Sequence, residues 1–297
     1  MASIIDLHIH SNFSDGELTP YAIIDEAVKN NVKVISITDH DSVEAYTKEV
    51  MQYAKQKGLL LISGVEMSTR LETGFHVLGY NIDIKNTKLL QTLSMLRNAR
   101  LDYLNNVAVK LRDLGYILDT DSLASLPTVT KAHISRQIVG NEANKNLLMK
   151  VFGHIPSMGE FIEAIMNDGC PAFVRKFSIT PIEASKIIHE AGGLVVLAHP
   201  IAYAYEDGVG VEQIALIIKE MNADGIEGNY IYVDAKGNVY NEVDFWNRFA
   251  TQNDVFSSVG SDFHNINPKY CAIGFVNTDF ELSATQTQKI LEKIIKQ

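Results

Sequence analysis

The stretch Ile4-Ile5-Asp6-Leu7-His8-Ile9-His10 decides the fold, because it combines a strand pattern with two closely spaced histidines. Its β-branched and apolar residues are typical of a buried strand. Residues two apart on a strand point to the same side, so His8 and His10 share a face. Two neutral imidazoles on one face suit a divalent metal. A His-x-His pair alone is a weak signal, so the prediction depends on the rest of the chain.

Strand-like and helix-like segments alternate along most of the sequence. Further strands are expected at 32–38, 59–65, 75–80, 194–198, 225–228 and 255–259. Helices are expected after Thr19, over 42–57, from Thr180 to Gly192, near 211–221 and 241–252, and over 283–296. Thr19 and Thr180 are each followed by proline, the pattern of an N-cap and a first helical position. The alternation predicts a parallel sheet or barrel with helices outside.

One block departs from this alternation. Between about residues 85 and 170 the apolar residues follow a helical period, and strand signals are nearly absent. We interpret 85–170 as a helical insertion, either a lid or a subdomain that covers substrate. The remaining segments, 1–84 and 171–297, would then form one discontinuous α/β barrel domain.

Composition limits the class of protein. The chain has 297 residues, with 36 acidic and 26 basic side chains, which gives a formal net charge of −10. This charge argues against a broad nucleic-acid-binding surface. No apolar run approaches the ~18–20 residues of a membrane span, and no signal peptide is visible. Cys170 and Cys271 are too few for a disulfide framework, and we interpret both as small apolar residues. We therefore expect a cytoplasmic protein.

Histidines and acids follow the predicted strands. Six of the nine histidines and several carboxylates lie in or just after strands, in the motifs Asp6-Leu7-His8-Ile9-His10-Ser11, Ser14-Asp15-Gly16, Thr38-Asp39-His40-Asp41, Gly64-Val65-Glu66, His76-Val77-Leu78-Gly79, Ala198-His199-Pro200 and Gly260-Ser261-Asp262-Phe263-His264. In an α/β barrel the strand ends converge on one face, where active sites lie. The pattern therefore predicts a site for several metal ions. His154 and His189 lie outside it and are interpreted as structural.

These motifs, in this order, resemble those of the PHP (polymerase and histidinol phosphatase) phosphoesterases, from residue 5 to about 275. The helical insertion is similar to that of the branch that contains nucleoside 3′,5′-bisphosphate phosphatases and 5′→3′ exoribonucleases. The resemblance implies a distorted (β/α)7 barrel. It also implies a hydrolase of phosphate esters, with a metal-activated hydroxide as the nucleophile and no catalytic side chain.

The resemblance also implies two to three divalent ions. One ion would be held by His8, His10, Glu66 and Asp262, a second by Asp15, His40 and His264, and a third by Glu66, His76 and His199. The donors suit Mn, Fe or Zn about equally. Asp6, Asp39 and Asp41 could orient the ligating imidazoles, and they are equally explained as cap and loop residues.

Four further residues are candidates for substrate binding. His133 and Arg136 lie one helical turn apart in the insertion, in a segment that resembles the branch's phosphate-binding segment. Arg175 and Lys176 follow the insertion, where the branch usually has a proline and then a basic residue. Because Arg175 replaces that proline, either residue could contact phosphate.

The resemblance to this branch thus implies removal of the 3′-phosphate from nucleoside 3′,5′-bisphosphates, with short RNA 5′ ends as a related substrate. The partner is a small phosphorylated molecule rather than an extended nucleic acid or a membrane. The alternatives are a histidinol- or sugar-phosphate phosphatase, an inert metal-binding regulatory module, and a proofreading module that would need a partner polymerase. The oligomeric state cannot be read from the sequence.

Overall fold

A computed structural model of the chain describes residues 4–234, 237–266, 272–274 and 284–295. Its centre is a curved sheet of seven strands in the order β1-β2-β3-β4-β5-β6-β9. The strands are β1 (Ile5–Ile9), β2 (Val34–Ile37), β3 (Leu60–Arg70), β4 (Gly74–Tyr80), β5 (Leu194–Leu197), β6 (Gly225–Asn229) and β9 (Phe256–Val259). Each of the predicted strands is present in the described residues, and its observed ends lie within about five residues of the predicted ones.

The first and last strands of the sheet meet just beyond their ends. Ile9 and Phe263 form a parallel bridge, and the His10 amide donates to the Phe263 carbonyl at 2.8 Å. The sheet is therefore a nearly closed barrel, which confirms the predicted α/β barrel class. Closure brings the carboxyl ends of β1 and β9 together, although they are about 250 residues apart in the chain.

The sheet is mixed rather than wholly parallel. β4 pairs antiparallel with both β3 and β5, whereas the other neighbours are parallel. The physical reason is the short connection at 71–73, because a parallel crossover needs a dozen or more residues. The reversal matters for the site. His76 lies near the start of β4 and pairs with Ser68, so it reaches the rim where the parallel strands end.

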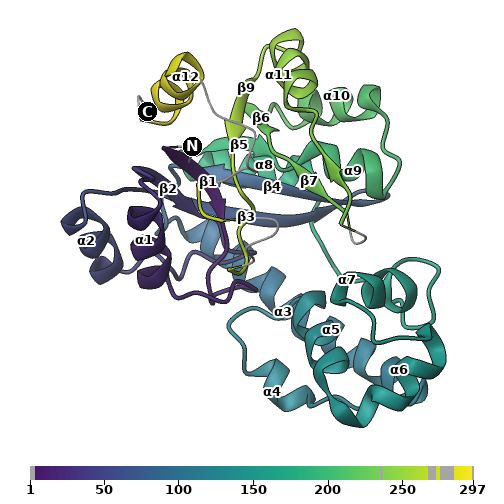
Figure 1. Cartoon of the computed structure of the whole chain (residues 1–297). Coiled ribbons are helices and arrows are strands. Elements are labelled where there is room, and N and C mark those ends of the chain that lie inside the picture. The colour runs from purple at the N-terminus through teal and green to yellow at the C-terminus, as the bar shows by residue number, and fades with distance from the viewer. Residues whose placement is uncertain (1–3, 235–236, 267–271, 275–283, 296–297) are drawn as a thin grey trace.

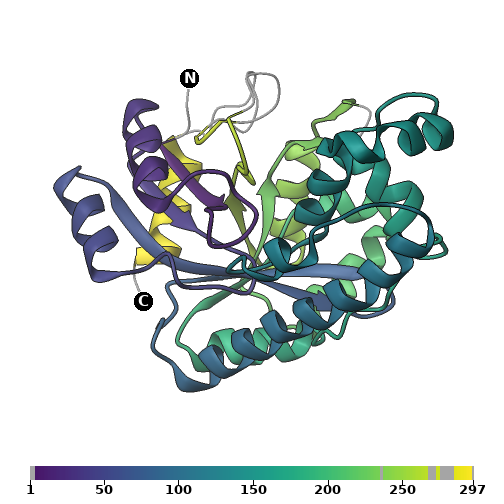
Figure 2. The ribbon, with the colours of Figure 1, turned by 90° about the horizontal axis from the view of Figure 1, so that it is seen from below.

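Helices cover the outside of the barrel (Figures 1 and 2). They are α1 (Pro20–Lys29), α2 (Lys48–Gln56), α8 (Pro181–Glu190), α9 (Pro200–Glu206), α10 (Val211–Glu220), α11 (Val243–Gln252) and α12 (Ala284–Ile295), and a small hairpin of β7 (Tyr232–Val233) and β8 (Val239–Tyr240) lies beside them. The predicted caps are confirmed, because the Thr19 and Thr180 hydroxyls accept from backbone amides of the first turns. The expected limits of the last helix, 283 and 296, lie outside the described residues.

The helix predicted over 42–57 is too long at its N-terminal end. It begins at Lys48, with Thr47 as its N-cap. Tyr46 is the cause, because its buried hydroxyl donates to the carbonyl oxygens of Ile37 and Ile62 and accepts from the Ile37 amide. These contacts hold residues 42–47 against the strand ends as a loop.

The segment expected to be an insertion forms a helical lobe below the barrel in Figure 1. It contains α3 (Thr87–Asp113), α4 (Thr120–Ala124), α5 (Lys131–Gly140), a 3-10 turn (Glu142–Asn144), α6 (Lys145–Phe152), α7 (Met158–Phe161) and a π-helical turn (Ile162–Met166). The lobe has its own apolar core, and α3 joins both cores: Leu89 and Leu93 pack in the barrel, whereas Leu104 and Leu111 pack in the lobe. Across the described residues, no helix is long and apolar enough to span a membrane.

Candidate metal centre

The barrel rim gathers the nine residues predicted as metal ligands. They come from the ends of five strands and from two loops, and all have polar atoms within a few ångström of another member of the set. Most of these side chains are buried, and His76, Asp262 and His264 are half-buried. The sequence positions are far apart, so the cluster is a product of the barrel topology.

His8 and His10 do share one face of β1, as their spacing predicts. Their Nε2 atoms lie 3.1 Å apart and face each other. Asp262 Oδ1 lies 3.3 Å from Nε2 of His8 and 3.1 Å from Nε2 of His10. These three residues form a compact group whose donor atoms could hold one ion.

Glu66 lies at the centre of the cluster. One carboxylate oxygen lies 2.9 Å from Nδ1 of His76 and 3.3 Å from Nε2 of His199. The other oxygen lies 2.8 Å from Nδ1 of His40 and 3.3 Å from Nε2 of His10. This position allows Glu66 to contact more than one ion, as the family resemblance implies.

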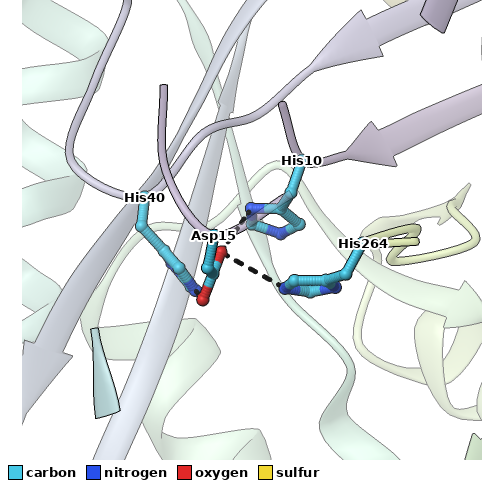
Figure 3. A group of neighbouring side chains, drawn as sticks. All are labelled: His10, Asp15, His40 and His264. Atoms are coloured by element: carbon cyan, nitrogen blue, oxygen red, sulfur yellow. Dashed lines mark ion pairs between the residues drawn. The ribbon is translucent and has the colours of Figure 1, made fainter. Parts of the chain in front are cut away.

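Asp15 forms the centre of a second group, shown in Figure 3. Its carboxylate oxygens lie 3.6 Å from His10 Nδ1, 3.7 Å from His40 Nε2 and 3.4 Å from His264 Nε2. Asp15 comes from the loop after β1, and His264 from the loop after β9. His10 and His40 each belong to two groups of donor atoms, whereas the ligand sets implied by the family resemblance shared only Glu66.

Several buried donor atoms in the cluster lack a hydrogen-bond partner. They are Asp15 Oδ1, His40 Nδ1, Glu66 Oε2, His76 Nδ1 and His199 Nδ1. His40 Nδ1 and Glu66 Oε2 are only 2.8 Å apart, yet they do not meet with hydrogen-bond geometry. An unpaired buried polar atom is costly, so such a set needs a shared partner. Imidazole nitrogens and carboxylate oxygens are the donors that Mn, Fe and Zn accept, and the residues therefore fit divalent ions.

The electrostatics of the cluster also favour cations. Burial disfavours the charged form of His10, but the carboxylates of Asp262 and Glu66 outweigh it and raise its pKa to about 10. At His40 burial dominates, and its pKa falls to about 4. Burial opposes ionisation of Glu66 as well, but the surrounding imidazoles hold its pKa well below the usual range. The carboxylates thus draw positive charge into a buried site.

The backbone at the rim takes up unusual conformations to present these side chains. Asp41, His199 and Asp262 all have positive φ, at 51°, 24° and 51°. Such angles are costly for non-glycine residues and concentrate at functional sites. Gly260 must be glycine for a different reason, because a Cβ there would lie 2.2 Å from His8 Cβ. The Gly-Ser-Asp motif after β9 therefore places Asp262 against β1.

Sequence reasoning missed Glu227. This buried residue of β6 contacts Nδ1 of His8 at 3.0 Å, and it accepts from the His199 amide at 2.9 Å. A carboxylate on the far nitrogen of a ligating imidazole fixes the ring and its tautomer. The available signal was an acidic residue inside an otherwise apolar, glycine-flanked strand.

The three aspartates near the site hold loops rather than imidazole rings. Asp39 accepts from the Ser11 amide and from the hydroxyls of Ser11 and Ser14, at 2.6–2.7 Å. Ser14 in turn lies 3.3 Å from His10 Nδ1, so Asp39 acts on that ring only through a serine. Asp6 accepts from the amides of Ser261 and Gly274. The sequence left two roles open for these aspartates, orientation of the imidazoles or a place in caps and loops, and these contacts agree with the second role.

Asp41 has a different partner, which the sequence did not reveal. Arg100 of α3 is buried and donates to the Asp41 carboxylate at 2.7–2.8 Å and to the Ser68 hydroxyl at 2.7 Å. This contact ties the insertion to the rim that carries the candidate metal ligands. Arg100 occurs in a charged stretch of a long helix, where an arginine normally lies in solvent, so its sequence context gave no signal.

A cavity of about 310 Å³ adjoins the metal centre on the side of the insertion. Asp15, His40 and His76 line one part of it. Four basic residues lie elsewhere in its wall, among small polar and apolar side chains, namely Arg70, Arg100, Lys131 and Lys176. We call this space the cationic cavity. Tyr103 and Phe173 add aromatic surface to its wall.

The four candidate substrate-binding residues occupy different places. Lys176 lines the cationic cavity, whereas Arg175 lines a separate hollow outside it. The His133 ring closes the capping box of α5, with Nδ1 3.2 Å from the Thr130 amide. Arg136 lies 3.6 Å from Glu17, in the loop after β1. Neither His133 nor Arg136 lines the cavity in the described structure, so a role in phosphate binding stays a prediction for both.

The two histidines interpreted as structural and the cysteine that the structure describes have partners of their own. His189 contacts Asp224 at 3.0 Å and His154 contacts Glu160 at 3.3 Å, and both pairs lie outside the metal centre. Cys170 is half-buried, with its thiol 3.1 Å from the Glu163 carbonyl oxygen. Cys271 lies outside the described residues.

Comparisons with known proteins agree with this site. The PHP domain family matches residues 6–179. A 5′-3′ exoribonuclease of Haemophilus influenzae is 33% identical over 89% of this chain and 91% of its own length. A 3′,5′-nucleoside bisphosphate phosphatase of Chromobacterium violaceum is 28% identical over 88% of this chain and 87% of its own length.

Solved structures show the same fold. A putative metal-dependent phosphoesterase from Bifidobacterium adolescentis covers 98% of this chain, with a TM-score of 0.75 at 21% identity. That match extends over 96% of the Bifidobacterium chain. A Chromobacterium violaceum protein described as an amidohydrolase, with bound sulfate, covers 90% of this chain and 89% of its own at a TM-score of 0.75 and 25% identity. The chain belongs to the PHP family of metal-dependent phosphoesterases, and it is a hydrolase of phosphoric ester bonds.

Proposed function

We propose that this phosphoesterase removes the 3′-phosphate of nucleoside 3′,5′-bisphosphates. The observation that carries the proposal is the cationic cavity, because it joins two sites for anions in one space. One phosphate would lie at the metal centre, and a second would lie among Arg100, Lys131 and Lys176. Tyr103 and Phe173 offer aromatic surface for the nucleoside that links the two phosphates.

The nine residues of the metal centre, His8, His10, Asp15, His40, Glu66, His76, His199, Asp262 and His264, would hold two or three ions. When bound, divalent ions lower the pKa of water and neutralise charge on phosphoryl oxygens. The rim residues fix the positions of the ligands, with Glu227 orienting His8 and Asp39 holding the loop that carries Asp15. Manganese, iron and zinc all suit this donor set.

The basic residues have a separate role in the proposed reaction. Lys176 and Lys131 would hold the 5′-phosphate and so place the 3′-phosphate at the metal centre. Positioning of this kind converts binding energy into rate. The reaction requires no nucleophilic side chain, because the attacking oxygen would come from water.

The charge of the cavity also discriminates between the candidate substrates. Histidinol phosphate carries an amino group, which four basic residues would repel. A sugar phosphate has one phosphate and leaves the basic residues without a partner. The wider cleft over the metal centre shares Arg70 and Lys131 with the cationic cavity, but it is also lined by Glu72, Asp168, Glu206 and Asp207, which disfavour long RNA. Short RNA 5′ ends remain compatible with the site.

A panel of phosphate esters with Mn2+ tests the proposal. We expect kcat/KM for adenosine 3′,5′-bisphosphate to exceed that for adenosine 3′-phosphate by roughly a hundredfold, the effect of one or two charged contacts to phosphate. Lys131→Met should remove most of this preference, whereas Lys150→Met, on the surface of α6, should leave it unchanged. Equal rates for the two nucleotides, or a preference for histidinol phosphate, would overturn the proposal.

A further inference from the structure

Two arginines of the insertion reach the loop that follows β2. Arg97 and Arg100 lie three residues apart on α3, so their side chains share one face of the helix. Arg100 is buried, and its Nε and Nη2 atoms lie 2.8 and 2.7 Å from one carboxylate oxygen of Asp41. Nη1 of Arg97 donates to the Asp41 carbonyl oxygen at 2.9 Å. Helix α3 thus contacts both the side chain and the backbone of one residue of the barrel rim.

Asp41 joins two candidate metal ligands. It directly follows His40, and its amide donates to the carbonyl oxygen of Glu66 at 2.9 Å. Its carboxylate also accepts from the Ser68 amide, two residues beyond Glu66, at 2.9 Å. Asp41 therefore fastens the loop after β2 to β3 at the point where the two ligands meet. There Nδ1 of His40 and Oε2 of Glu66 lie 2.8 Å apart.

The backbone of Asp41 needs this support. Its φ is 51°, a left-handed conformation that costs energy in residues other than glycine. Such a conformation persists where the surrounding contacts fix it. The Asp41 side chain is fully buried, and in the part of the chain that the structure describes Arg100 is the only basic side chain hydrogen-bonded to it. Without Arg100 the residue would keep a buried charge and lose its main contact.

Arg100 uses its donors mostly within the chain. Besides the contacts with Asp41, Nη2 donates to the Ser68 hydroxyl at 2.7 Å, and Nη1 donates to the Val129 carbonyl oxygen at 3.3 Å. Each nitrogen of the guanidinium therefore donates within the chain. Lys131, in the same cavity wall, donates to Asn167 at 2.8 Å, which leaves two of the donors of its ammonium group for a substrate. The geometry of Arg100 suits positioning better than phosphate binding.

We propose that Arg97 and Arg100 are positioning residues of the metal centre. By holding Asp41, they fix His40 and Glu66 where both side chains can contact the same ion. The inference rests on the metal ligands of the proposed function and not on its substrate. Arg100 therefore contributes to hydrolysis through metal affinity, whereas the lysines of the cationic cavity supply the contacts to the 5′-phosphate.

The first test measures Mn2+ binding in the absence of substrate. Chelator-stripped protein is titrated with Mn2+ in a calorimeter, and circular dichroism confirms that each variant is folded. Arg100→Gln should weaken Mn2+ binding by roughly 10- to 100-fold, the usual effect of losing a group that orients a metal ligand. Arg97→Gln removes one contact to the backbone and should weaken binding by about threefold to tenfold. Arg112→Gln, at an exposed position near the end of α3, is the matched control and should bind Mn2+ normally.

A second measurement separates positioning from substrate binding. At saturating Mn2+, kcat/KM is measured for adenosine 3′,5′-bisphosphate and for adenosine 3′-phosphate. In Arg100→Gln the ratio of the two should stay within about twofold of the wild-type ratio, because the lysine contacts to the 5′-phosphate remain. Lys131→Met should show the opposite pattern, with normal Mn2+ affinity and a reduced ratio.

Asp41→Asn tests whether the arginine acts through the aspartate. If it does, the double variant Arg100→Gln/Asp41→Asn should bind Mn2+ within about twofold of Asp41→Asn alone, whereas independent effects would multiply. Arg97 is half-buried and lies outside the cavity wall, so Arg97→Gln decides the question if the buried Arg100 cannot be replaced without unfolding.

The outcomes distinguish this inference from the proposed function. The inference is overturned if the folded arginine variants bind Mn2+ as tightly as wild-type protein, or if Arg100→Gln loses the preference for the bisphosphate at saturating Mn2+. Multiplying effects in the double variant would also overturn it. If wild-type protein binds Mn2+ but releases no 3′-phosphate, the proposed function fails while the Mn2+ titrations still test the arginines. If wild-type protein binds no Mn2+, both fail.

Discussion

At the scale of single residues, the metal centre depends on carboxylates that contact imidazoles from opposite sides. Asp262 and Glu66 both face Nε2 of His8, and Glu227 faces Nδ1 of the same ring. The first two were predictable, because both follow a predicted strand directly or within a few residues. Glu227 was not, because its function depends on β6 lying two strands from β1 across the barrel seam, which no local pattern encodes.

Glu227→Gln tests the contact with His8. The amide keeps the size of the side chain but removes its charge, so the His8 ring becomes a poorer and less well oriented ligand. We expect about a 10- to 100-fold loss of Mn2+ affinity, the usual effect of losing such a partner. Activity measured during a Mn2+ titration gives this affinity. Glu242→Gln, which alters an exposed pair with Tyr205, is the matched control and should bind Mn2+ normally.

Lys176 should make the binding of adenosine 3′,5′-bisphosphate depend on pH. Burial disfavours its ammonium form, and Arg100 adds repulsion, so its pKa falls to about 7. The positive charge is therefore lost as pH rises through about 7. We expect KM for adenosine 3′,5′-bisphosphate, relative to adenosine 3′-phosphate, to rise between about pH 6 and about pH 8. In Lys176→Arg the charge persists, so the ratio should be flat. Parallel pH profiles in both proteins would contradict this role.

At the scale of elements, the two helix starts with a threonine and a proline were predicted correctly, whereas the direction of β4 was not. Thr19 and Thr180 cap their helices as predicted, because a cap depends on neighbouring residues alone. The antiparallel direction of β4 depends on a short connection that the alternating pattern obscured. His76 lies inside an apolar strand, and the reversal of that strand brings it to the rim.

The contacts of Tyr46 also could not be predicted from local sequence signals, and they can be tested by a stability measurement. Its hydroxyl contacts the backbone of Ile37, at the end of β2, and of Ile62, near the start of β3, and these contacts hold residues 42–47 out of a helix. In Tyr46→Phe three backbone groups lose that partner while burial stays the same. We expect the free energy of unfolding to fall by about 1–3 kcal/mol, measured by chemical denaturation. Tyr21→Phe, at an exposed tyrosine on α1, should be neutral, and equal stability of both variants would exclude the anchoring role.

At the scale of the whole molecule, the barrel and the helical lobe together make the site. The barrel brings ligands from both ends of the chain to one rim. The lobe adds Lys131 and Arg100, and the segment that follows it adds Lys176. The division at 1–84, 85–170 and 171–297 stays a prediction, and the separate apolar core of the lobe supports it. The acidic chain thus surrounds a local excess of positive charge that metal ions would increase.

Metal-dependent hydrolysis at the rim of the barrel is tested most directly by measuring metal content and phosphate release together. Wild-type protein and Asp262→Ala are stripped with a chelator and reloaded with Mn2+, and far-UV circular dichroism confirms that both are folded. Wild-type protein should lose hydrolysis of adenosine 3′,5′-bisphosphate on stripping and regain it on reloading. Asp262→Ala should bind less metal and hydrolyse the substrate slower by roughly a hundredfold or more. Full turnover by the stripped protein, or by Asp262→Ala, would contradict a metal-dependent mechanism at this site.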